Sequence, residues 1–83
     1  MKPSQIKATL QMGKAGLTDA LVEELRAQMK KHKVVKIKLL RSAREELSPK
    51  AVAQELAKRT QARVLDVRGG TAVLAAADYR PTD

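Results

Sequence analysis

The spacing of apolar residues changes twice within the first 40 residues, and this change constrains the fold more than any other feature. From Ile6 to Met12 apolar and polar residues alternate, which is the pattern of a strand with one buried face. From Leu17 to Met29 a leucine or methionine recurs every fourth residue, as on the buried side of a helix. Alternation returns from Val34 to Leu40. Strand, helix and strand in this order predict two parallel strands joined by a right-handed crossover.

The second half of the chain predicts a helix followed by a hairpin. Ser48 is a suitable N-cap, and Pro49 follows it at the first helical position, where proline is favoured. We expect this helix to end near Thr60. Two further runs typical of strands then follow, and Gly69-Gly70 separates them. A two-residue glycine connection suits a tight primed turn, so these runs should form an antiparallel hairpin with strands at Arg63–Arg68 and Thr71–Ala77.

The resulting order, β-α-β-α-β-β, predicts an α/β two-layer sandwich, in which a four-stranded mixed sheet carries the helices on one face. The polar segment Ser42–Leu47 is expected to be a loop. Residues 1–83 are expected to form one domain with a core spanning about residues 6–79. A domain of this size buries only about 60% of the surface that its unfolded chain exposes, which leaves little room for a deep substrate cleft.

The positive charge of the chain is concentrated in its first half. Residues 1–44 hold eleven of the 17 Lys and Arg residues but only three of the nine acids, so they carry the whole net charge of +8. The segment Lys30–Arg44 contains seven cations and no acid. Such asymmetry favours a polyanionic partner, either nucleic acid or an acidic membrane surface. The alternative is a solvated strand face whose lysines discourage edge pairing.

Several classes of function find no support in the residues present. The chain has no cysteine and a single histidine, His32, so no metal site or cofactor is predicted. No nucleophile–base set or carboxylate pair stands out, and we expect no enzyme. The only aromatic residue is Tyr79, which argues against a base-stacking platform. Because no signal peptide or transmembrane run is found, the expected location is the cytoplasm.

The loop Gly13-Lys14-Ala15-Gly16 is the strongest candidate for a binding site. It lies between a predicted strand and a helix whose N-cap is Thr18. Glycines permit a close approach to the backbone, and the start of a helix presents unpaired N–H groups to an anion. A glycine-x-x-glycine loop that clamps the RNA backbone is the solution of the KH domain. The alternative is an ordinary strand-to-helix turn.

The predicted RNA-binding set comprises this loop, Thr18 and a group of cations from the basic segment, namely Lys33, Lys36, Lys38 and Arg41. Because these groups contact phosphates, affinity should depend strongly on salt. A small basic DNA-binding protein of the chromatin type is the main alternative. It explains the charge and size of the chain but not the loop.

At these residues the sequence resembles the CRM domain family (chloroplast RNA splicing and ribosome maturation), and in particular its short YhbY-like members. The resemblance rests on the segments Met12–Thr18, Asp19–Leu25, His32–Lys38 and Glu55–Thr60, and on the glycine hairpin. It implies a KH-like fold similar to the C-terminal domain of translation initiation factor three, with RNA bound through residues 13–16. Short members of the family associate with pre-ribosomal large subunits, so ribosomal RNA is the implied partner of a protein expected to be monomeric.

Overall fold

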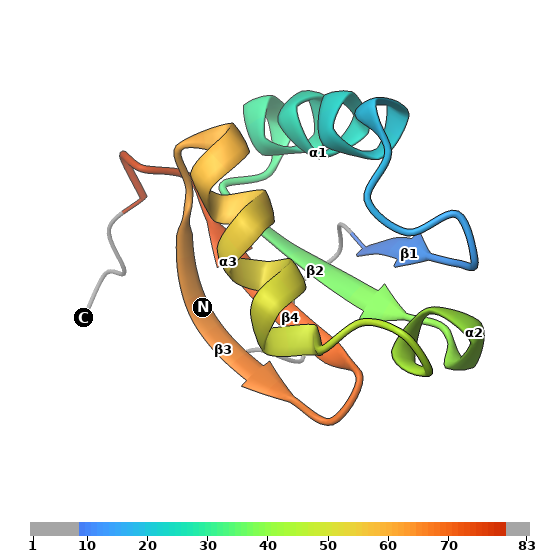
Figure 1. The fold of residues 1–83 in the computed structure, drawn as a ribbon. Coiled ribbons are helices and arrows are strands. Elements are labelled where there is room, and N and C mark those ends of the chain that lie inside the picture. Colours follow the sequence, from blue (N-terminus) through green and yellow to red (C-terminus); the bar gives the residue numbers. More distant parts are fainter. Residues whose placement is uncertain (1–8, 80–83) are drawn as a thin grey trace.

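The computed structural model describes residues 9–79 and arranges them as a four-stranded sheet with helices α1 and α3 on one face (Figure 1). The predicted order of strands and helices is confirmed, with one short helix, α2, added after the second strand. The elements are β1 (Thr9–Met12), α1 (Asp19–Lys31), β2 (Val34–Leu39), α2 (Arg41–Arg44), α3 (Pro49–Thr60), β3 (Arg63–Arg68) and β4 (Thr71–Ala75).

The strand order across the sheet is β1-β2-β4-β3. β1 and β2 are parallel, as the crossover predicts, and β4 is antiparallel to both of its neighbours. The carboxyl ends of β1 and β2 therefore lie at the same end of the sheet as the β3–β4 turn (Figure 1). We call this the loop end, because the glycine loop follows β1 there. The opposite end of the sheet is called the far end.

The core lies between the sheet and the two long helices. Leu10 and Met12 of β1 are buried while Thr9 and Gln11 are exposed, as alternation predicts. The largest fully buried side chains come from both layers and are Met12, Leu25, Ile37, Leu39, Leu56, Leu74, Val35 and Val52.

The buried side of α1 differs slightly from the predicted stripe. Val22, Leu25 and Met29 are buried, whereas Leu17 and Leu21 are only partly buried against the core. A step of four residues turns a helix by about 400°, about 40° more than one revolution. A stripe with this spacing therefore drifts around the helix, and Val22, three residues before Leu25, completes the buried side.

Both long helices begin at the predicted caps. The Thr18 hydroxyl oxygen accepts a hydrogen bond of 3.1 Å from the Leu21 N–H, and the Ser48 hydroxyl oxygen accepts one of 3.5 Å from Ala51. These bonds satisfy N–H groups that have no partner within the helix. α3 ends at Thr60, and the residue that caps it, Gln61, takes the left-handed conformation with φ 57°.

The prediction of a loop over Ser42–Leu47 is wrong for its first residues, because Arg41–Arg44 forms α2. The Ala43 and Arg44 N–H groups both donate to the Leu40 carbonyl, at 2.9 and 3.0 Å, and the Ala43 side chain is buried. A single helical turn is too short to show a periodic pattern and depends on tertiary packing.

The predicted ends of two strands also differ from those in the structure. β2 ends one residue earlier than expected, at Leu39, and β4 ends two residues earlier, at Ala75. After β4 the Tyr79 N–H donates to the Ala76 carbonyl at 2.9 Å, so the chain turns away from the sheet. The first three residues predicted for β1, 6–8, lie outside the described part of the chain.

Candidate nucleic-acid interface

The glycine loop is a tight turn that connects β1 to α1. The Gly16 N–H donates to the Gly13 carbonyl at 3.0 Å, which is the hydrogen bond of a β-turn. Lys14 and Ala15 occupy the corner of this turn, and both are exposed. Gly16 has φ +69°, a conformation that glycine adopts without steric cost. The backbone of the corner is therefore presented to solvent in a fixed shape.

Gly16→Ala is expected to lower the free energy of unfolding by about 1–2 kcal/mol, because an L-residue is strained at positive φ. The new Cβ would also lie 3.2 Å from Leu47 Cδ1, which is a tight contact. Gly13→Ala is the matched control, since its Cβ would meet Leu40 Cδ1 at 3.8 Å, an ordinary contact, and φ there is not positive. Urea denaturation measures both variants, and equal stability of the two would contradict the proposed strain at Gly16.

The start of α1 adds further N–H donors next to the turn. The Thr18 side chain caps this helix end by accepting a hydrogen bond from the Leu21 N–H. Within residues 9–79, the N–H groups of Lys14, Ala15 and Leu17 have no backbone acceptor. Asp19, in the first turn of α1, partly offsets the positive end of the helix dipole. The arrangement thus provides a short series of backbone donors beside one mobile cation, Lys14.

Helix α2 lies beside the glycine loop (Figure 1). The Leu40 N–H donates to the Met12 carbonyl at 2.8 Å, which brings the end of β2 to the start of the loop. Arg41 and Arg44 are both exposed and three residues apart in one helical turn, a spacing that places them on neighbouring parts of the helix surface. The loop end therefore combines Lys14 with two arginines from a separate segment.

The hairpin turn reaches the same surface. The Gly70 carbonyl accepts a hydrogen bond of 2.7 Å from the Leu39 N–H, and a Cβ at Gly70 would lie 2.5 Å from Arg44 Cδ. The Arg44 side chain thus lies directly against the turn. Gly69 has φ +54°, as the first position of a primed turn requires.

The structure separates the predicted site residues into three places. Arg41 lies at the loop end with the glycine loop and with Thr18, the N-cap of α1. Lys36 and Lys38 lie on the sheet face away from the helices, paired with Thr9 and Gln11 of β1, and Lys38 is the nearer of the two to the loop end.

Lys33 lies at the far end, before the start of β2, and is not brought together with the loop. A six-residue strand spans about 20 Å, so β2 separates Lys33 from the glycine loop. Its Nζ lies 2.9 Å from Asp78 Oδ2. The hydrogen bond and the positive charge of this ammonium group lower the pKa of the Asp78 carboxyl.

Two cations of the loop end were missing from the predicted set. Arg44 belongs to the acid-free basic segment, but the helical turn that pairs it with Arg41 is too short to be recognised in the sequence. Arg68 ends β3 next to the hairpin turn, and its Nε lies 3.2 Å from Asp66 Oδ2.

Charge at the loop end is mainly positive and mostly unpaired. Within residues 9–79, no ion pair of 4.0 Å or less involves Lys14, Lys38, Arg41 or Arg44. Glu45 and Glu46 follow α2 and reduce the local excess. The described residues contain no group of three metal-ligating side chains. Over the same range no helix is both long enough and apolar enough to cross a membrane.

Comparison with known proteins identifies relatives of this chain. The fold is similar to the solution structure of the hypothetical protein SAV1595 from Staphylococcus aureus, which is proposed to bind RNA, with a TM-score of 0.71 and 17% sequence identity. The match covers 95% of this chain and 80% of that one. No match is found among curated proteins. The CRS1/YhbY (CRM) domain matches residues 2–75, and the chain therefore belongs to the CRM domain family.

Proposed function

We propose that this domain binds RNA by holding the phosphate backbone at the loop end. The observation that carries the proposal is the exposed Lys14-Ala15 corner, whose N–H groups have no backbone acceptor within residues 9–79, beside the unpaired cations Arg41 and Arg44. Membership of the CRM family and the fold shared with SAV1595 support RNA binding, and with it a role other than catalysis.

The residues of the site determine which part of the RNA is held. Backbone N–H groups at a helix start and flexible cations can donate hydrogen bonds but cannot accept them. Such groups suit phosphate oxygens, which are acceptors. The described loop end has no aromatic side chain on which a base could stack. Lys38 and Lys36 extend the contact along the open face of the sheet. The protein then recognises the shape of the backbone and leaves the choice of sequence to RNA structure or to other partners.

Affinity for RNA is expected to fall steeply with salt. If about four to six phosphates are neutralised, the slope of log K against log salt is about −3 to −5. Fluorescence anisotropy with a labelled RNA hairpin, repeated over a range of potassium chloride concentrations, measures this slope. A slope near zero would contradict binding through phosphates. A DNA hairpin of the same sequence, bound equally well, would favour the alternative of a basic DNA-binding protein.

The target that fits the family best is ribosomal RNA of the large subunit during its assembly. Sequencing of the RNA cross-linked to the protein in cells tests this part of the proposal. Enrichment of large-subunit ribosomal RNA over its share of total RNA is the expected result. Recovery in proportion to total RNA, or of DNA across the genome, would overturn it without affecting the site at the loop end.

A further inference from the structure

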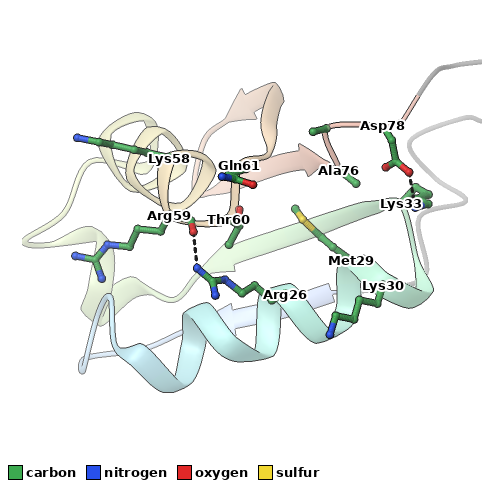
Figure 2. A pocket seen from close by; sticks show the side chains of 11 residues that line it. Arg26, Met29, Lys30, Lys33, Lys58, Arg59, Thr60, Gln61, Ala76 and Asp78 are labelled. Atoms are coloured by element: carbon green, nitrogen blue, oxygen red, sulfur yellow. Dashed lines mark hydrogen bonds and ion pairs between the residues drawn. The ribbon is translucent and has the colours of Figure 1, made fainter.

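A groove of about 670 Å³ lies at the far end of the molecule, away from the glycine loop. It is formed by the last turns of α1 and α3 and by the segment after β4 (Figure 2). Its charged lining consists of five cations and one acid, which are Arg26, Lys30, Lys33, Lys58, Arg59 and Asp78. These cations come from parts of the chain that are distant in sequence and meet only in the folded domain.

The side chains give the groove a polar rim and an apolar centre (Figure 2). Arg26 reaches from α1 towards α3, and its Nη2 donates to the Arg59 carbonyl at 2.8 Å. Met29 points from α1 into the space between the helices, and Lys30 lies on the rim beside it. Lys58 extends away from the other cations. The groove is therefore open between two helices, with Arg26 and Lys30 along its length, while the Arg59 side chain extends away from its centre (Figure 2).

Ion pairs neutralise only part of this charge. Lys33 is paired with Asp78, and Arg26 Nη1 lies 3.8 Å from Glu23 Oε1. Arg59 Nε lies 2.8 Å from Glu55 Oε2, a hydrogen bond that lowers the pKa of Glu55. Among the described residues Lys30 has no ion-pair partner. Basic residues in a last helical turn also offset the negative end of the helix dipole, and this structural role accounts for some of the cations.

Gln61 caps the end of α3 and contributes a polar side chain to the groove. It follows α3 with φ 57°, and it is the only non-glycine residue with positive φ in the described part of the chain. Glycine is the usual residue here because it lacks the steric penalty. This conformation closes α3, because the Gln61 and Ala62 N–H groups both donate to the Ala57 carbonyl, and such closures are common at helix ends. The Gln61 amide lies over the groove (Figure 2), and within residues 9–79 it makes no side-chain hydrogen bond.

We propose that this groove is a second RNA-binding site, which takes a segment of RNA other than the one held at the loop end. Lys30 contacts a phosphate, Met29 forms an apolar floor, and the Gln61 amide hydrogen-bonds to a nucleotide. The inference rests on the proposed function. α1 has 13 residues and is about 20 Å long, with the glycine loop at its start and the groove at its end. The two sites therefore hold two segments of one folded RNA, which raises affinity through multivalency.

The test compares three single variants with the wild-type chain, using a fluorescein-labelled RNA hairpin with single-stranded flanks. Lys30→Gln is expected to lower affinity about tenfold, the effect of one hydrogen bond to a charged group, and to reduce the salt slope by about 0.7. Lys31→Gln removes the same charge from the same helical turn but outside the groove, and should bind like wild type. Gln61→Gly should lower affinity about fivefold without changing the salt slope.

Stability separates binding from folding, because Gln61→Gly relieves strain and should leave the unfolding temperature unchanged or raised. Equal affinities of Lys30→Gln and Lys31→Gln, or wild-type affinity of Gln61→Gly, would overturn the second site. The variant Lys14→Asp/Ala15→Asp is measured in parallel. If it loses affinity while the groove variants do not, only the groove proposal fails. If this double variant binds like wild type, the proposed site at the loop end fails.

Discussion

Replacing Lys14 and Ala15 together with aspartate is expected to lower the affinity for RNA by about 100-fold, which corresponds to about 2.7 kcal/mol of binding free energy. The change removes one cation and adds two carboxylates at the corner of the glycine turn. A lost charge-assisted hydrogen bond accounts for about 1.5–3 kcal/mol, and repulsion between the new carboxylates and the phosphates adds to it. The loss is measured by anisotropy with the labelled RNA hairpin at constant salt.

This double substitution should leave the fold intact. Both side chains are exposed, and the turn is closed by a backbone hydrogen bond between Gly16 and Gly13. Aspartate is accepted in turns and is favourable near the start of α1. The control is Lys50→Asp/Ala51→Asp, which alters the same dipeptide, also exposed, in the first turn of α3. The control should lose much less affinity, and equal losses would show that only net charge matters.

Leu25→Ala is expected to reduce the free energy of unfolding by about 2–5 kcal/mol, because it leaves a cavity in the core. Leu25 is fully buried between α1 and the sheet. A domain of this size has a total stability of only about 4–12 kcal/mol, so the variant should lose a large part of it. Leu21→Ala should cost less, since Leu21 is only partly buried. Chemical denaturation followed by circular dichroism measures both.

Leu65→Ala provides a control with the same change of side chain. Leu65 is 46% exposed and lies at the irregularity of β3 between Val64 and Asp66. Its truncation should change the stability by no more than about 0.5 kcal/mol. If Leu25→Ala were as stable as Leu65→Ala, the packing of α1 against the sheet described above would be wrong.

The long elements of this fold could be predicted from the sequence because two independent signals coincide in each. α1 and α3 have both an apolar side and a capping residue, and their predicted starts at Thr18 and Ser48 are confirmed. The glycine hairpin has valine-containing runs typical of strands on both sides and a turn that accepts positive φ at Gly69. α2 has neither signal, because one helical turn held by the buried Ala43 leaves no periodic trace.

The candidate site could be predicted only in part, because neighbours in the sequence are not always neighbours in space. The basic segment from Lys30 to Arg44 includes β2, and an extended strand separates its two ends by about 20 Å. Lys33 therefore belongs to the far end and Arg41 to the loop end. The far-end groove was not predicted, since its cations are scattered over α1 and α3 and no motif connects them.

The central claim, that RNA is held at the loop end, is tested most directly by the backbone amide signals of the protein. A two-dimensional ¹H–¹⁵N NMR titration with the RNA hairpin reports on the N–H groups that are proposed to bind phosphate. We expect the largest shifts at residues 13–18 and at Arg41–Arg44, and much smaller shifts of the same amides in the Lys14→Asp/Ala15→Asp variant at the same RNA concentration. Large shifts elsewhere on the wild-type protein, with the amides of residues 13–18 unchanged at saturation, would contradict the claim.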